Sequence, residues 1–180
     1  NESDNVHLGG YPGPLREMAG VWVEEIDALA PEQTNEVKFT DGTTASCNLL
    51  CDLMHLEGAE ALATYEKDFY AGMPAATRNT YGEGAAYYVG TQMDAAGLAK
   101  ILDRAVSEVG VKAVIPETTG LEVTCRTSDD TRYYYVMNFK DEDQILPESL
   151  AGKIDLISGE VIPAGTVLKK WDVLILQEAK

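Results

Sequence analysis

The chain has 180 residues, of which 45% are hydrophobic and 24% charged, and its formal net charge is −16. This composition is typical of globular proteins, and the length allows one ordinary domain or two small ones. Because acidic residues outnumber basic ones 30 to 14, nucleic acids and anionic membranes are poor partners, whereas a neutral ligand such as a sugar is compatible with the charge.

The first residues, NESDNVHLGG, have neither the basic region nor the apolar core of a secretory signal. Together with an odd number of cysteines, three, this favours reduced thiols and a cytoplasmic location. Pro14 then stands like the first residue of a short helix, and Gly20 like its stop.

A series of extended segments follows, marked by β-branched and aromatic residues and by turn signals between them. Gly72 and Pro74 separate two of the segments, and Tyr-Gly-Glu-Gly at 81–84 predicts a tight turn. The predicted strands are 21–29, a hairpin at 36–50 around Asp41-Gly42, its continuation at 51–58, and then 60–68, 75–82 and 84–92.

One long helix is predicted after these strands, with Asp94 as its N-cap and Gly110 as its stop. Its apolar residues recur at three- and four-residue spacing, which is the pattern of a helix that packs on one face. The stripe consists of Leu98, Ile101, Leu102, Ala105, Val106 and Val109.

From about residue 114 the sequence predicts strands and turns alone, which is typical of a small antiparallel sandwich or barrel. The fold class is therefore α+β and rich in strands, with one domain at 1–112 and a second at 113–180. The first has a single long helix, which would leave the faces of a parallel α/β sheet poorly covered, so it looks like half of a domain. The strands predicted in the second are 121–128, 131–139, 152–158 and 172–177.

Cys47, Cys51 and His55 are spaced by four residues and carry side chains that zinc prefers. Eight residues of extended strand span roughly 26 Å, too far for one ion to bridge. We therefore interpret the cysteines as buried thiols and His55 as an ordinary histidine. Neither cysteine has a flanking glycine, which argues against a nucleophile elbow.

Three acidic clusters raise the question of glycoside hydrolysis, which uses a pair of carboxylates. They are Glu24-Glu25, Asp129-Asp130 and the Asp-Glu-Asp run at 141–143. Neighbouring residues of a strand point to opposite faces, and the other two clusters lie in predicted turns. We therefore expect solvated acids.

The remaining candidates are aromatic and basic. The tyrosines at 133–135, with Phe139, could stack on sugars, but alternate residues of a strand must face a core, which favours packing. Arg78 stands beside Asn79 in an otherwise apolar strand, where a guanidinium suits an ion pair with a nearby acid or with a neighbouring subunit. The turn at 81–84 enters a strand and lacks the lysine of a phosphate-binding loop.

Two long stretches resemble the later part of bacterial family-42 β-galactosidases. They are HLGGYPGPLREMAGVWVEEIDAL at 7–29 and HLEGAEALATYEKDFYAGMPAATRNTYGEGAAYYVGTQ at 55–92, and the strand-rich tail adds to the likeness. The resemblance implies that 1–112 are the second half of a flavodoxin- or amidotransferase-like α/β domain that builds a trimer. It implies a small antiparallel β domain at 113–180. It also implies that the catalytic (β/α)8 barrel, with its two catalytic glutamates, lies outside these residues.

On this resemblance we expect a non-catalytic piece of a longer enzyme that hydrolyses terminal β-D-galactosides with retention. No catalytic, cofactor-binding or metal-binding residue is assigned to the chain, and no cofactor is expected. The expected partners are further copies of the chain, as a trimer, and the galactoside substrate of the whole enzyme. Two alternatives stay open, namely a carbohydrate-binding or assembly module and an amidotransferase-type enzyme that uses Cys47 or Cys51.

Overall fold

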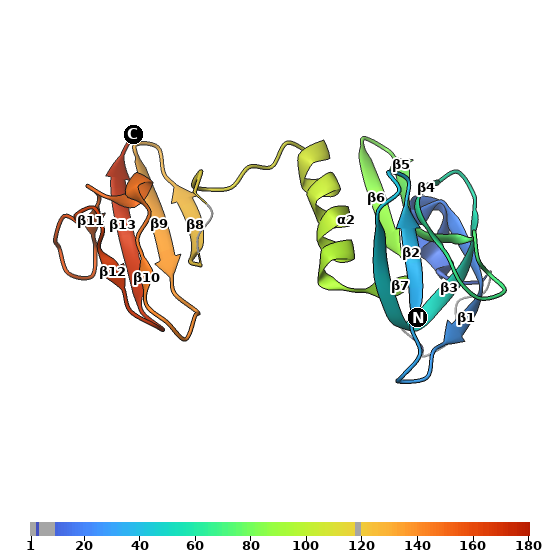
Figure 1. Cartoon of the computed structure of the whole chain (residues 1–180). Coiled ribbons are helices and arrows are strands. Elements are labelled where there is room, and N and C mark those ends of the chain that lie inside the picture. The colour runs from blue at the N-terminus through green and yellow to red at the C-terminus, as the bar shows by residue number, and fades with distance from the viewer. Residues whose placement is uncertain (1–2, 4–9, 118–119) are drawn as a thin grey trace. The chain divides into compact units, whose positions relative to one another are not determined.

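The computed structural model describes residues 3, 10–117 and 120–180. The chain divides into two compact units, Asn1–Gly110 and Val111–Lys180, and each has its own hydrophobic core. Figure 1 shows the strand-rich character of both, so the predicted strand-rich α+β fold is confirmed. None of the helices in the described part of the chain has the length and apolar character that crossing a membrane requires.

The first unit is one antiparallel sheet with short helices before it and a long helix after it. The strand order is β1-β3-β2-β4-β5-β6, and β7 pairs with β3. The elements are η1 (Gly13–Leu15), α1 (Arg16–Ala19), β1 (Val21–Ala28), β2 (Asn35–Phe39), β3 (Thr44–Leu56), β4 (Glu60–Tyr65), β5 (Pro74–Tyr81), β6 (Gly84–Val89), β7 (Thr91–Met93) and α2 (Ala95–Glu108).

The predicted short helix before β1 is confirmed. It ends at Gly20, which has a positive φ of 63° and donates its N–H to the carbonyl of Arg16. The side chain of Asn79 in β5 donates to the carbonyls of Glu17 and Met18. A Cβ at position 20 would lie 2.5 Å from the Asn79 side chain, so only glycine fits at this helix end. Asn79 therefore ties the helix to the sheet.

The predicted hairpin at 36–50 and its continuation form β2 and β3. β3 pairs with β2 along its first part and with β1 along its second part. Between the two parts the ladder with β7 is interrupted after Asn48 and resumes at Cys51. Leu49, in this interruption, has a positive φ of 69°. Such a bulge bends the strand, which lets one strand serve both parts of the sheet.

The predicted strand at 84–92 is divided in two at Gly90. The Gly90 N–H donates to the carbonyl of Ala75, and its carbonyl accepts from the N–H of Asp52. A Cβ on Gly90 would lie 2.5 Å from Cε of Met54 and 3.0 Å from Cβ of Asp52. The chain therefore crosses to β3 at this glycine, where β7 then pairs, and the sheet closes on itself.

Antiparallel pairing explains how this unit is compact with one long helix. Every strand pairing in its described residues is antiparallel, and such a sheet can leave one face to solvent, whereas a parallel sheet needs helices on both faces. Two clusters of buried side chains fill its interior. The larger includes Val37, Phe39, Cys47, Cys51, Leu53, Leu62, Tyr65, Tyr70 and Ile101, and the smaller includes Ala19, Val21, Val23, Met54 and Ala59.

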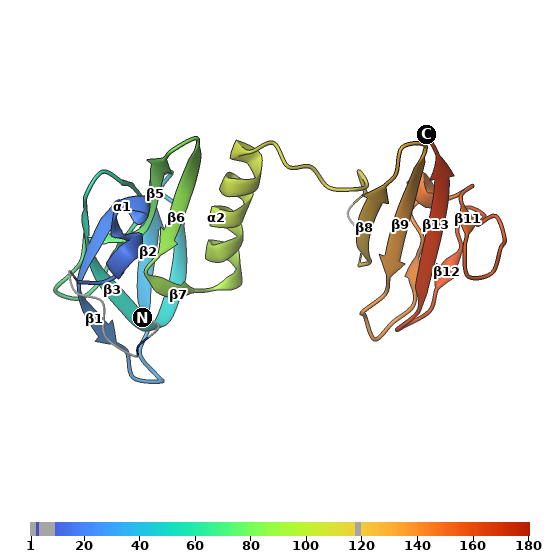
Figure 2. The ribbon, with the colours of Figure 1, turned by 180° about the vertical axis from the view of Figure 1, so that it is seen from behind.

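The second unit contains a four-stranded antiparallel sheet of order β11-β13-β9-β8 and a two-stranded sheet of β10 and β12. Figure 2 shows the four-stranded sheet from behind. Tyr134, Val136, Leu150, Leu168 and Leu176 lie in its core. The elements are β8 (Glu122–Thr127), β9 (Thr131–Met137), β10 (Gln144–Ile145), η2 (Glu148–Leu150), β11 (Ile154–Asp155), β12 (Val167–Leu168) and β13 (Val173–Ala179).

The prediction of a strand at 152–158 in this unit is mostly wrong. Of 152–158 only Ile154 and Asp155 are extended. The buried carboxylate of Asp155 accepts from the N–H and the hydroxyl of Ser158 and from the N–H of Ile175. These hydrogen bonds turn the chain back after two residues, because an aspartate side chain competes with the strand for backbone donors.

Candidate functional site

Helix α2 has the most unusual surface in the described part of the first unit. Its predicted N-cap is confirmed, since the carboxylate of Asp94 accepts from the N–H of Gly97 at 2.8 Å. The same carboxylate accepts from the N–H of Ser46 in β3 at 2.9 Å. These two bonds fix the start of the helix beside β3, and they lower the pKa of Asp94.

A row of charged residues, rather than apolar ones, holds much of α2 to the sheet. Lys100, Arg104 and Glu108 follow one another at four-residue spacing and so lie on one side of the helix. Lys100 pairs with Asp41 in the β2–β3 turn, and Arg104 pairs with Glu60 of β4 at 2.6 Å. This row faces the strands that supply its partners.

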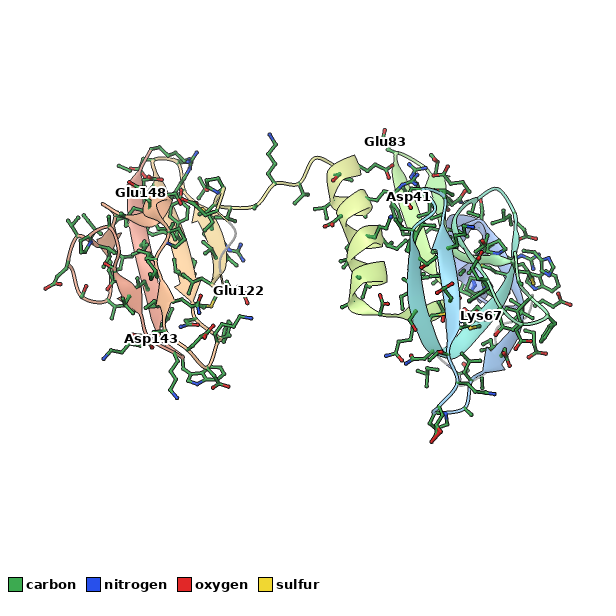
Figure 3. The ribbon with its side chains drawn as sticks, in the orientation of Figure 1. Asp41, Lys67, Glu83, Glu122, Asp143 and Glu148 are labelled. Atoms are coloured by element: carbon green, nitrogen blue, oxygen red, sulfur yellow. The ribbon has the colours of Figure 1, made fainter. Side chains whose placement is uncertain are left out.

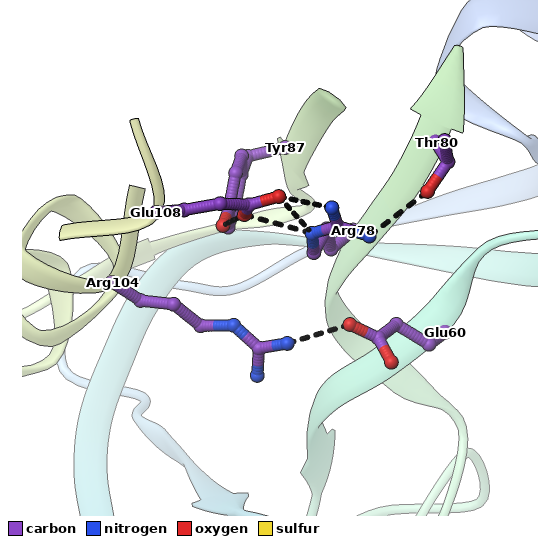
Figure 4. A network of polar contacts seen from close by, with 6 residues as sticks. All are labelled: Glu60, Arg78, Thr80, Tyr87, Arg104 and Glu108. Carbon is purple, nitrogen blue, oxygen red and sulfur yellow. Dashed lines mark hydrogen bonds and ion pairs between the residues drawn. The ribbon is translucent and has the colours of Figure 1, made fainter. Parts of the chain in front are cut away.

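The third member of the row belongs to a polar cluster, which Figure 4 shows from close by. Nε of Arg78 donates to both carboxylate oxygens of Glu108, at 2.9 and 3.1 Å, and Nη1 donates to Thr80 at 3.1 Å. The hydroxyl of Tyr87 also donates to Glu108. The prediction that Arg78 pairs with a nearby acid is confirmed, and the acid comes from the end of α2.

The electrostatics of this cluster argue against proton transfer. Hydrogen bonds from Arg78 and then Tyr87 lower the pKa of Glu108 to about 2, and the Glu108 carboxylate raises the pKa of Arg78. A general acid or base is most effective with a pKa near the working pH. Glu108 is a permanent anion near neutrality, so the cluster is suited to fixing the helix rather than to catalysis.

The helix touches the core through very few residues. Only Gly97 and Ile101 are buried along α2. A Cβ at Gly97 would lie 2.6 Å from Cβ of Ala45 and 3.3 Å from Cβ of Met93, so the helix backbone lies directly against β3 and β7 there. Because the contact is so close at one point, the remaining apolar residues of α2 cannot all reach the sheet.

The predicted apolar stripe of α2 therefore faces outward for most of its length. Ile101 is 4% exposed, but four other members of the stripe are well exposed: Leu98 43%, Leu102 55%, Val106 38% and Val109 73%. The helix and the spacing of its apolar stripe are as predicted, but of the stripe only Ile101 is buried and Ala105 is half-buried. The charged row lies on the side of α2 that Asp41, Glu60 and Arg78 can reach, and its own side chains remain partly exposed.

A hollow of about 600 Å³ adjoins this exposed stripe, between the end of α2 and the β5–β6 hairpin. Arg78 and Tyr87 line it from the sheet, and Ala105, Val106 and Val109 line it from the helix. Glu83 stands at the tip of the hairpin, away from the sheet (Figure 3). We refer to the residues Leu98, Leu102, Val106 and Val109 together with this hollow as the α2 surface.

The cysteines and the histidine that the sequence singled out have different surroundings. His55 is exposed, bonds to Glu24 at 2.6 Å and stacks on Trp22 with ring centroids 5.1 Å apart. Cys47 and Cys51 are both buried in the larger core. The strand was predicted correctly, and the interpretation of Cys47 and Cys51 as buried thiols is confirmed. The bulge after Asn48 was not predicted.

The acidic clusters are dispersed and solvated. Glu24 and Glu25 are exposed, and Asp129-Asp130 lie in the turn between β8 and β9. The run at 141–143 lies in the loop after β9, and Figure 3 shows Asp143 there, where its carboxylate caps the N–H of Lys170. None of these acids is placed by the structure opposite a second carboxylate across a cavity, as glycoside hydrolysis requires.

The aromatic run is divided between the two faces of its sheet. Tyr134 is buried in the core, and its hydroxyl donates to Glu178 at 2.9 Å, whereas Tyr133 and Tyr135 are half-buried on the other face. Phe139, beyond the strand, is exposed. Core packing is therefore confirmed for Tyr134, which is the member that alternation places inward.

Sequence reasoning missed Asp52, a buried acid in β3. Burial raises its pKa, and the hydroxyl of Tyr88 donates to it at 2.6 Å. The only signal in the sequence was an acid between apolar residues of a strand. One carboxyl group beside one phenol supplies neither the spacing nor the pair of acids of a hydrolase, and the described residues contain no group of three side chains able to hold a metal ion.

Comparisons with known proteins divide the chain in a similar way. Residues 1–112 match a family model described as the β-galactosidase trimerisation domain, and residues 120–178 match one described as the β-galactosidase C-terminal domain.

Individual relatives agree with these matches over nearly the whole chain. A β-galactosidase of Lactobacillus acidophilus is 42% identical over 98% of this chain and 26% of its own length. A crystal structure of a β-galactosidase from Bacillus circulans sp. alkalophilus superposes with a TM-score of 0.86 and 39% identity, covering 99% of this chain and 27% of that one. A structure of a GH42 β-galactosidase from G. stearothermophilus gives a TM-score of 0.81 and 30% identity, covering 99% of this chain and 26% of that one. The chain thus spans about a quarter of the length of these relatives.

Proposed function

The chain belongs to the family-42 β-galactosidases, and on this premise we propose that it is the non-catalytic, subunit-joining part of such an enzyme. Residues 1–112 would act as the trimer-building domain and 113–180 as the C-terminal domain. The whole enzyme would hydrolyse terminal β-galactosides with catalytic groups that lie in other residues.

The α2 surface carries the assembly part of the proposal. A continuous exposed apolar stripe is uncommon on a monomeric protein and often marks an interaction site. This stripe lies on the unit that matches a trimerisation domain. The charged row beside the stripe fixes the helix through the ion pairs of Lys100, Arg104 and Glu108. A rigid helix with an apolar outer face is suited to packing against a second copy, since little side-chain order is lost on contact.

The test of assembly is the mass of the 180-residue chain in solution, measured by light scattering or sedimentation over a range of concentrations. We expect association, and we expect the double variant Leu102→Gln, Val106→Gln to remain monomeric at concentrations where the parent chain associates. The matched control is Ile145→Gln, Val161→Gln, two exposed apolar residues of the second unit, which should associate like the parent.

Two outcomes would contradict this proposal. A chain that stays monomeric at every concentration would contradict the assembly role. Control substitutions that disrupt association as strongly as the α2 substitutions would show that the α2 surface is not the specific contact. In the whole enzyme, a trimer that survives the α2 substitutions would likewise place another surface at the contact.

The enzymatic part is tested separately with a chromogenic β-galactoside. We expect hydrolysis by the whole enzyme and no turnover by the 180 residues alone, because the described acids form no catalytic pair. Hydrolysis by the purified chain would contradict the proposed division of labour, and an inactive whole enzyme would contradict the assigned reaction.

A further inference from the structure

The bulge in β3 brings Cys47 and Cys51 close together within one strand. On β7 the partner of Cys47 is Met93 and the partner of Cys51 is Thr91, so a step of four residues along β3 corresponds to a step of two along β7. Residues two apart in a strand have Cα atoms roughly 6.6 Å apart. With the spacing of their β7 partners, the Cα atoms of Cys47 and Cys51 lie at the upper end of the range of about 4.4–6.8 Å seen in disulfides.

Both thiols lie in the same buried pocket of the larger core. Sγ of Cys51 lies 3.8 Å from the hydroxyl oxygen of Thr91. The hydroxyls of Tyr65 and Tyr70, which belong to the same core, donate to the carbonyl of Gly90 and to Asp27. Because both thiols are buried in one core on either side of the bulge, we expect a bond between the sulfurs to require only a local adjustment of the strand.

The polar surroundings distinguish the two thiols from each other. The neighbouring Cys47 thiol lowers the pKa of Cys51, while the neighbouring Cys51 and burial raise the pKa of Cys47. The thiolate is the reactive form in exchange with disulfides. Cys51 is thus suited to attack first and Cys47 to resolve the product.

A second hollow, of about 270 Å³, is lined by residues of the strands that pair with β3 at the two cysteines. Asp27, Asn35 and Tyr70 form part of its lining. Asp27 is the strand partner of Cys51, and Asn35 is the strand partner of Cys47. The Tyr70 hydroxyl donates to Asp27 at 2.8 Å. This hollow is the side from which we expect a small reagent to approach the thiols.

We propose that Cys47 and Cys51 are a redox-active pair that forms a reversible disulfide across the β3 bulge, with low-molecular-weight disulfides as the oxidant. The Cys51 thiolate attacks one sulfur of the oxidant, forms a mixed disulfide and releases the first thiolate, which takes up a proton. Cys47 then loses its proton and attacks the Cys51 sulfur, forming the internal disulfide and releasing the second thiolate. The oxidant gains two electrons and both thiol protons, and the two cysteines lose them.

The test uses the 180-residue chain with Cys125→Ser as background, so that two thiols remain. The folded chain is treated with bis(2-hydroxyethyl) disulfide, quenched in acid and alkylated, then digested with trypsin. Cys47 and Cys51 lie in one peptide, from Phe39 to Lys67. We expect this peptide to lose the mass of two hydrogen atoms, to carry no adduct, and to become alkylated only after reduction.

Single variants separate the two steps. With Cys47→Ser the reaction should stop at a hydroxyethyl-thio adduct on Cys51, and with Cys51→Ser it should leave Cys47 free to alkylate. Three results would overturn the proposal: a fully alkylated peptide from the folded chain, an internal disulfide that forms only in urea, or an adduct on each cysteine without an internal bond. The last would show that the sulfurs do not meet.

Discussion

Replacing Ile101 by alanine should destabilise the first unit, while the same change at its neighbour Leu102 should hardly affect the unit itself. Ile101 is 4% exposed and lies in the larger core, whereas Leu102 is 55% exposed. Truncating a buried isoleucine to alanine costs about 2–5 kcal/mol. Alanine favours the helix by only a few tenths of a kcal/mol, so a loss of roughly 2–4 kcal/mol remains. At an exposed position the expected change is within about 0.5 kcal/mol.

The measurement is urea unfolding followed by helical ellipticity, because α2 is the long helix of the described residues. It should be repeated at several protein concentrations. If the α2 surface joins copies of the chain, Leu102→Ala will reduce the concentration dependence of the unfolding midpoint without lowering the stability of the dilute chain. Equal losses at both positions in the dilute chain would refute the orientation of the helix and the argument built on it.

Three further predictions concern the same unit. The Thr77 hydroxyl is buried without a hydrogen-bond partner among the described residues, so Thr77→Val should leave the urea midpoint unchanged or raise it; a clear drop would reveal a partner. Gly90→Ala should cost about 1–3 kcal/mol by overpacking, whereas Gly84→Ala, where a Cβ meets nothing closer than 3.9 Å, should cost little; equal effects would contradict the tight closure. The pKa of Glu108 falls from 4.5 to about 2 on folding, so its contribution to stability is complete above pH 4.5 and is lost as the pH falls toward 2. Acid unfolding of Glu108→Gln should therefore depend less on pH in that window than that of the exposed control Glu17→Gln, and identical profiles would refute the pairing.

Local features were predictable because each depends on a few neighbouring residues. Asp94 caps the helix that follows it, Gly20 ends the helix before it, and Asp41-Gly42 turns the hairpin. The places where prediction failed depend on distant partners. The break at Gly90 follows from the approach of Met54 and Asp52, and the short β11 follows from the bond between Asp155 and Ile175.

The sequence by itself predicted most of the strands, the helical segments, the spacing of the apolar stripe of α2, and the likeness to family-42 β-galactosidases. Only the tertiary structure decided how much of that stripe is buried and that a bulge separates the two cysteines of β3. The physical reason is the same in both cases. Segments far away in the chain supply Asp41, Glu60 and Arg78 to the charged row of α2, and β7 pairs with β3 on both sides of the bulge. The spacing of apolar and charged residues along the chain determines a pattern. The partners that the fold brings to this pattern decide which of its residues are buried.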